Sequence, residues 1–149
     1  MRIQIEHPGQ ADVLALLVKL DAYLGALYPA ESNHLLDIES LLREDVCFMV
    51  ARDDAGTALG CAAIVSHDGY AELKRMFVDP ARRGAGAARA LLAALANRAR
   101  EAGLACLRLE TGIHQPQAIA LYRGAGFSEC APCGGYLPDP LSVFMEKTL

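Results

Sequence analysis

A short glycine-rich stretch of the sequence has the composition of an anion-binding loop. Arg83-Gly84-Ala85-Gly86-Ala87-Ala88 follows a β-prone segment and leads into an Ala- and Leu-rich helical pattern. Small residues at such a junction let several backbone N–H groups point at one anion, and the helix N-terminus adds partial positive charge. Arg82, Arg83 and Arg89 are near enough in sequence to support a polyphosphate. The spacing predicts a phosphate-binding loop; the alternative is a glycine-rich helix start with solvated arginines.

Two nucleotide-binding folds that use glycine-rich loops fit the sequence poorly. A P-loop ends in Gly-Lys-Ser/Thr, and no lysine or hydroxyl residue directly follows Gly86. In a dinucleotide-binding fold the third glycine position would hold Arg89, and the strands upstream of the loop have an antiparallel pattern. An NAD-binding oxidoreductase fragment is therefore a minor alternative.

The spacing of apolar residues predicts the elements that position this loop. In chain order we expect a strand at 2–6, helices at about 13–27 and 35–42, strands at 46–52, 58–66 and 70–78, a helix from the loop to about 102, a strand at 104–110, a helix at 116–125, and closing strands from 127 and at 142–146. The crossover from Tyr70 to Glu110 makes one pair parallel in a largely antiparallel sheet. Glu72 and Lys74 alternate with Leu73, and a polar face on a central strand indicates a site.

Two ordered blocks of the sequence carry a family resemblance. The first, Val78-Asp79-Pro80-Ala81-Arg82-Arg83-Gly84-Ala85-Gly86-Ala87-Ala88, resembles the acyl-CoA loop of the GNAT superfamily of N-acyltransferases, whose pattern is Q/R-x-x-G-x-G/A. The second, Gln115-Pro116-Gln117-Ala118-Ile119-Ala120-Leu121-Tyr122 with Gly126-Phe127, resembles a later N-x-x-A-x-x-L-Y-x-x-x-G-F element. Gln115 departs from the family by standing where many members have Asn. The segment 136–147 resembles a poorly characterised bacterial branch.

The resemblance implies a fold and a co-substrate. The expected fold is α/β, GNAT-like: a largely antiparallel six- to seven-stranded sheet with a central parallel pair splayed for CoA, flanked by about four helices, in one N-acetyltransferase domain spanning 1–149. The co-substrate would be acetyl-CoA, with no metal. Its pantetheine arm would pair with the exposed strand edge at Met76, Phe77 and Val78, and its phosphates would bind at the loop. Arg89 and Gln115 would also contact the cofactor.

The resemblance also assigns roles in direct transfer to an amine. Tyr122 matches the family tyrosine that protonates the departing thiolate; alternatively it is a packed aromatic side chain. Glu72 is the candidate base, with a salt bridge to Lys74 or Arg75 as the alternative. A backbone N–H near Phe77 could serve the oxyanion.

Acceptor contacts are expected where the family has its acceptor cleft. Asn33, His34 and His114 fall in the two regions concerned, as do Tyr28 and Glu31. The alternative for either histidine is a surface or helix-capping role. The acceptor would be a small-molecule or peptide amine.

The bulk composition limits the remaining function classes. The net charge is −4 and the pI about 5.5, which disfavours general binding to nucleic acid or to anionic membranes. With no apolar run near membrane-span length we expect a cytoplasmic protein, and edge strands allow a homodimer. Cys130-x-x-Cys133 has no second ligand pair and is interpreted as structural. A CoA-binding sensor domain without catalysis is the main rival to an enzyme.

Overall fold

The computed structural model describes residues 1–32, 37–132 and 134–149. Three residues singled out from the sequence, Asn33, His34 and Cys133, therefore lie outside the described residues. No helix within these ranges is long and apolar enough to cross a membrane. The described residues also hold no group of three or more His, Cys, Asp or Glu side chains arranged to bind a metal ion.

The helices and strands follow the predicted order. They are β1 (Arg2–Ile5), α1 (Ala11–Leu27), a 3-10 turn (Ala30–Ser32), α2 (Ile38–Leu41), β2 (Val46–Arg52), β3 (Ala58–Ser66), β4 (Tyr70–Val78), a second 3-10 turn (Pro80–Arg82), α3 (Ala87–Glu101), β5 (Cys106–Gly112), α4 (Pro116–Gly124), β6 (Ser128–Glu129) and β7 (Ser142–Thr148). β5 begins two residues later than expected because the Leu104 N–H still bonds the Ala99 carbonyl at the end of α3.

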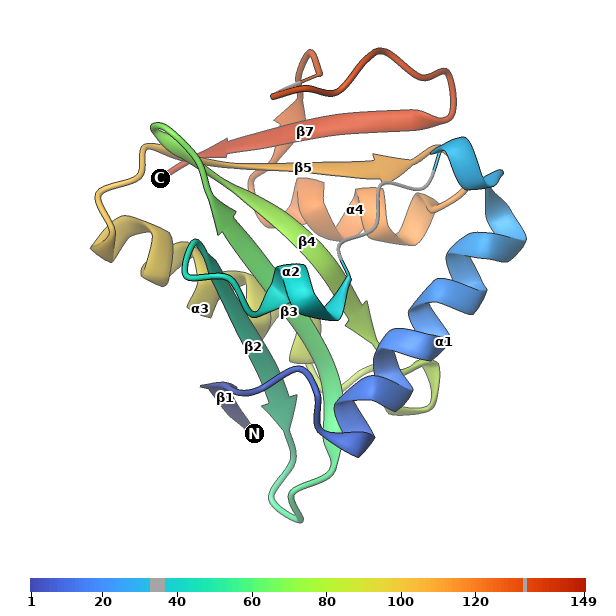
Figure 1. The fold of residues 1–149 in the computed structure, drawn as a ribbon, viewed down its shortest axis with the longest axis vertical. Coiled ribbons are helices and arrows are strands. Elements are labelled where there is room, and N and C mark those ends of the chain that lie inside the picture. The colour runs from blue at the N-terminus through green and yellow to red at the C-terminus, as the bar shows by residue number, and fades with distance from the viewer. Residues whose placement is uncertain (33–36, 133) are drawn as a thin grey trace.

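The strands form one seven-stranded sheet with a single parallel pair. Their order is β1-β2-β3-β4-β5-β7-β6 across the described residues. β4 and β5 run parallel, and each of the other neighbouring pairs is antiparallel. The parallel pair arises because α3 carries the chain back along one face before β5 begins (Figure 1). The predicted GNAT-like architecture is confirmed.

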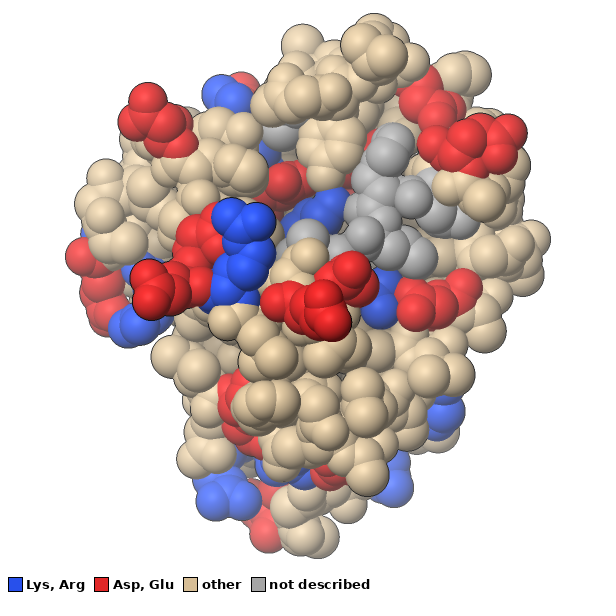
Figure 2. Space-filling model, in the orientation of Figure 1, with Lys and Arg blue, Asp and Glu red and all other residues tan. Residues whose placement is uncertain are grey.

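Helices cover both faces of the sheet. Leu91 and Leu95 of α3 pack on one face, in a core cluster that includes Leu73 of β4 and Leu109 of β5. Apolar residues of α1, spaced three and four apart, pack on the other face with Phe77 of β4; they are Val13, Leu16, Leu17 and Leu20. Over the face shown in Figure 2, acidic and basic side chains are interspersed around the hollow near its centre.

A β-bulge in β4 separates the two central strands. The parallel pairing of β4 with β5 ends at Leu73 and Leu109. Just beyond it, Arg75 and Met76 of β4 stand opposite the single residue Ala62 of β3, and Arg75 has a φ of 57°. An extra residue bends the strand that carries it. β4 therefore turns away from β5, and the strands diverge toward α1 and α4 (Figure 1).

Candidate active site

The glycine-rich loop opens helix α3 in the way the sequence predicts. Gly86 is the N-cap residue of α3 with a φ of 81°, and Gly84 has a φ of 93°. These left-handed conformations favour glycine, and they turn the chain so that the first amides of α3 face outward. Before the loop, the Asp79 carboxylate accepts a hydrogen bond from the Ala81 N–H and pairs with Lys19 at 2.8 Å. The contacts of Asp79 therefore hold the chain in place before the loop, and the two glycines set its turn into α3.

A large cleft of about 820 Å³ runs along this loop. Its walls come from α1, the end of β4, the loop with the start of α3, and α4; they are Leu20, Tyr23, Met76, Phe77, Val78, Arg83, Gly84, Gly86, Ala87, Ala88, Arg89, Gln115, Pro116, Gln117, Ala118, Leu121 and Tyr122. The residues predicted to bind the cofactor line this cleft, except Arg82 and Ala85. In β4 the segment 76–78 pairs with β3 but lies beyond the last pair with β5, so one strand edge faces the cleft.

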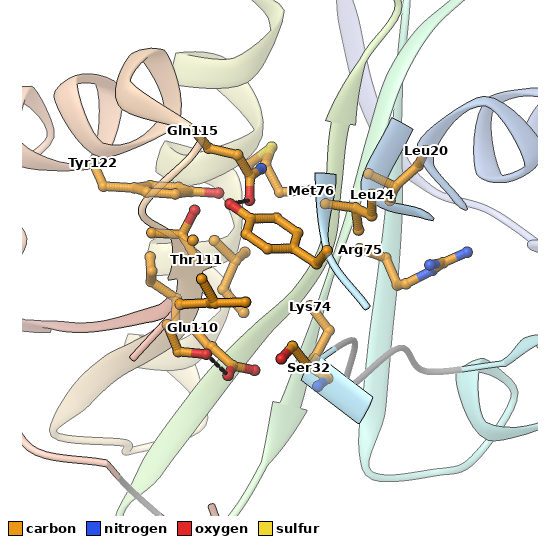
Figure 3. A pocket seen from close by; sticks show the side chains of 16 residues that line it. Leu20, Leu24, Ser32, Lys74, Arg75, Met76, Glu110, Thr111, Gln115 and Tyr122 are labelled. Atoms are coloured by element: carbon orange, nitrogen blue, oxygen red, sulfur yellow. Dashed lines mark hydrogen bonds between the residues drawn. The ribbon is translucent and has the colours of Figure 1, made fainter. Parts of the chain in front are cut away.

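A second, smaller cavity of about 110 Å³ lies between the splayed strands. Its wall is mixed, and its apolar part is formed by leucines from α1, β4, β5 and the segment before β7; they are Leu20, Leu24, Leu73, Leu109 and Leu141. Among its polar side chains are Tyr28, Ser32, Lys74 and Glu110 (Figure 3). A cavity of this size suits a small molecule.

The cleft and the cavity meet. Leu20, Met76, Gln115 and Tyr122 line both of them. A ligand whose reactive end follows the open edge of β4 would therefore reach the mouth of the small cavity at Tyr122 and Met76. The extended cleft beside the glycine-rich loop and the compact cavity therefore share one wall.

Tyr122 stands at this wall on the last turns of α4. Its side chain is 6% exposed and packs edge-on against the Phe127 ring, with 5.7 Å between centroids. Burial raises the pKa of the phenol well above its ordinary value near 10. Tyr122 therefore stays protonated at neutral pH and can donate a proton into the junction.

The comparisons with known proteins agree with this geometry. The model of the acetyltransferase (GNAT) family matches residues 15–127, which is more than half of the chain. The chain belongs to the GNAT family. A relative from Azospirillum brasilense, named IAA acetyltransferase, is 53% identical over 146 residues, covering 97% of this chain and 95% of the relative. An uncharacterized N-acetyltransferase from Bacillus subtilis, YsnE, is 32% identical over the whole of both chains.

A solved structure supports the same family. The crystal structure of a proposed acyl-CoA N-acyltransferase from Klebsiella pneumoniae superposes with a TM-score of 0.87 at 42% identity, covering 99% of this chain and 97% of that one. This GNAT protein is accordingly an acetyl-CoA-dependent N-acetyltransferase.

Tyr28 organises the corner of the GNAT site between α1 and α4. Its hydroxyl donates to Gln115 Oε1 at 3.2 Å and accepts from the His114 N–H at 3.1 Å, and its ring stacks on His114 at 5.5 Å between centroids. The Gln115 amide oxygen, at the position where many GNAT members have Asn, is thereby engaged inside the protein. Burial raises the pKa of Tyr28.

The predicted base and the predicted acceptor residues fall in different places. Glu72 is not among the described residues that line either cavity; its carboxylate contacts His67 Nε2 at 3.2 Å and lies 3.8 Å from Lys74 Nζ. His114 reaches the site through its backbone N–H and its ring contact with Tyr28. Asn33 and His34 lie outside the described residues.

The sequence does not single out Lys74 and Glu110, two of the charged residues in the wall of the compact cavity, as ligand contacts. It places Lys74 beside Glu72 on the polar face of a strand, and Glu110 at the end of the next strand. Each is the first residue after the last parallel pair, Leu73 with Leu109, so each stands where the strands begin to separate. The alternation of Lys74 with Leu73 was a signal, but nothing local indicated that these positions face a cavity.

Proposed function

We propose that this enzyme transfers acetyl directly from acetyl-CoA to a small amine within a ternary complex. The amine nitrogen attacks the thioester carbonyl, the carbon–sulfur bond breaks, and the products are the N-acetylated amine and CoA. The observation that carries this proposal is the wall shared by the cleft and the cavity at Met76 and Tyr122. It places donor and acceptor next to each other and needs no covalent acyl-enzyme.

Tyr122 would move the proton that this reaction requires. The phenol gives its proton to the sulfur as the thiolate departs and regains one from the amine nitrogen, so the net transfer is from amine to thiolate. Its position on the wall shared by the cleft and the cavity supports this role, and its raised pKa keeps the phenol protonated at alkaline pH as well. Glu72 stays a prediction as the base; its position behind Lys74 would require a water chain to the amine.

The cofactor would bind along the large cleft. The open edge of β4 at Met76, Phe77 and Val78 would pair with the pantetheine arm, and the loop around Gly84 and Gly86 would hold the pyrophosphate at the start of α3. Arg83 lines the cleft from an exposed position, with Nη1 3.4 Å from Gln117 Oε1. A guanidinium there would contribute charge-assisted bonds to phosphate.

We also propose a domain organisation, a location and an oligomeric state for the protein. The whole chain would act as one acetyltransferase domain, in the cytoplasm, with a homodimer possible through the exposed sheet edge at β6. The small volume of the proposed acceptor cavity favours a small-molecule amine over a peptide.

Release of free CoA thiol tests the proposal. The purified enzyme is mixed with acetyl-CoA and a panel of small amines, and separately with IAA, the compound in the name of the Azospirillum relative. Amine-dependent thiol release with an N-acetylated product by mass spectrometry supports direct transfer. Acetyl-CoA binding by calorimetry without release on any amine would support a sensor domain and reject the proposal.

A further inference from the structure

The compact cavity carries opposite charges at the end remote from the reaction. Lys74, Ser32 and Glu110 lie at the end opposite to Gln115 and Tyr122 (Figure 3). Lys74 comes from β4 and Glu110 from β5, each one residue past the last parallel pair. The rest of this wall combines leucines with polar residues and with Arg75. A cation and a carboxylate placed in such surroundings lose hydration, which is unfavourable unless other groups interact with them.

Lys74 is held in place at this end. Its side chain is only 13% exposed, and its ammonium donates to Tyr136 Oη at 2.6 Å. Glu72 Oε2 lies 3.8 Å away, which is an ion pair without a hydrogen bond. The ammonium is therefore fixed by a neutral phenol on one side and balanced at longer range by Glu72. This arrangement orients Lys74 as a binding group for an anion in the cavity.

Glu110, on the neighbouring strand β5, is also held in place by a hydroxyl group. Its Oε2 accepts a hydrogen bond from Ser142 Oγ at 2.7 Å, and Ser142 also lines the cavity. A carboxylate oriented by a hydroxyl group can accept hydrogen bonds from an ammonium. The remote end thus presents one site suited to a carboxylate and one suited to an ammonium, on neighbouring strands.

We propose that the acceptor is a small diamino acid, whose α-carboxylate binds Lys74, whose α-ammonium binds Glu110, and whose distal amine reaches Tyr122 and is acetylated. This inference rests on the proposed function and names its substrate class. The apolar leucines between the two ends would contact the methylene chain. A diamine lacks the partner of Lys74, and an ω-amino acid lacks the partner of Glu110.

Three matched acceptors test the assignment: ornithine, putrescine, which lacks the carboxylate, and 5-aminopentanoate, which lacks the α-ammonium. The same set is repeated one methylene longer with lysine, cadaverine and 6-aminohexanoate. Because a charge-assisted hydrogen bond in a partly buried site changes affinity by about 10-fold or more, we expect kcat/KM for the diamino acid to exceed each analogue by at least that factor. The acetyl group should be on the distal nitrogen.

Each variant should abolish the preference over one analogue and keep the preference over the other. In Lys74→Met the advantage of the diamino acid over the diamine should fall to about 2-fold or less, and in Glu110→Gln the advantage over the ω-amino acid should do so. Lys74→Arg keeps the charge and should retain most of the preference. Lys147→Met, which removes a lysine outside the compact cavity, is the matched control and should change neither ratio.

The possible failures are distinguishable. If the wild-type enzyme uses diamines or ω-amino acids as well as diamino acids, or acetylates the α-nitrogen, the substrate assignment is wrong and the transferase proposal stands. If both variants lower both ratios equally, with melting temperatures reduced, the two residues act on the fold and the assignment also fails. If acetyl-CoA binds but no amine is acetylated, the proposed function fails and the inference with it.

Discussion

Tyr28 and Gly112 fit so closely that a methyl group on Gly112 would overlap the Tyr28 hydroxyl. Gly112 ends β5, and Tyr28 follows α1, so the contact joins the two walls of the acceptor cavity. The same hydroxyl bonds Gln115 and the His114 amide. Tyr28 can therefore pack against the start of α4 because Gly112 has no side chain.

Gly112→Ala should displace Tyr28 and destabilise the fold. Overpacking of this kind reduces the free energy of unfolding by about 1–3 kcal/mol, which urea denaturation would measure. Because the clash is with Tyr28, the added destabilisation should shrink in the Tyr28→Ala background. Gly25→Ala in α1 is the matched control, since no atom lies within 4 Å of its added methyl group, and it should be neutral or stabilising. Equal effects of Gly112→Ala in both backgrounds would contradict the contact.

Tyr122→Phe should lower kcat about 100-fold or more with little change in the KM for acetyl-CoA. The phenyl ring preserves the packing against Phe127, while the proton donor is lost. Steady-state kinetics with the best acceptor would measure the effect. Tyr70→Phe, in a ring stacked on His67 outside both cavities, is the control and should retain wild-type kcat. A Tyr122→Phe enzyme with normal kcat would exclude the proton-transfer role.

With an acceptor that carries a single amine, the pH profile of the wild-type enzyme should have no falling limb below about pH 10. Burial raises the pKa of Tyr122, so the phenol keeps its proton through the range in which an exposed tyrosine would begin to ionise. Activity should instead rise with pH as the acceptor amine loses its proton, up to the amine's own pKa. Initial rates from pH 6 to about pH 10 in constant ionic strength would show this. A decline near pH 8 would point to another titrating acid.

Arg83→Gln should weaken acetyl-CoA binding about 5- to 10-fold, because a phosphate would lose a charged donor. Calorimetric titration with acetyl-CoA would give the dissociation constant. The ratio of the dissociation constants of variant and wild type should become smaller at high salt, since Arg83 is exposed and salt screens its charge. Arg100→Gln, near the other end of α3, removes the same charge and should bind acetyl-CoA normally. If the two variants behave alike, the loop does not hold the phosphates.

Arg52→Gln should lower stability at neutral pH by about 1–2 kcal/mol and flatten its dependence on acid. Arg52 joins Glu6 at 2.8 Å and Asp12 at 2.6 Å, and its hydrogen bonds lower the pKa of both carboxyl groups. A lowered folded-state pKa stabilises the protein above the unfolded value, about 4.5 for Glu6, and this contribution is lost as pH falls through the folded-state pKa. The difference in unfolding free energy between wild type and variant should therefore shrink as the pH falls below about 4.5 and through the lowered folded-state pKa values. Urea denaturation at several pH values would test this, with the exposed Arg43→Gln as control.

The sequence alone predicted the element order, and its motifs singled out the glycine-rich loop and Tyr122, which line one cleft. These depend on local information: apolar spacing over one element, glycines whose left-handed conformation is needed within a few residues, and two motifs whose residues are adjacent in the chain. That is why Arg83, Gly86 and Ala88 could be assigned to the large cleft, and they do line it.

Only the tertiary structure revealed the compact cavity that we propose as the acceptor site. The bulge at Arg75 and Met76 ends the parallel pairing after Leu73, and this separation turns Lys74 and Glu110 into cavity walls. Lys74 lines the cavity because the pairing of β4 with β5 stops at Leu73. The point at which this pairing stops depends on β3, β4 and β5 together, and β5 is far from the other two strands in sequence. Glu72, with the same local pattern as Lys74, lies before that point and contacts His67, because β4 is still paired with β5 there.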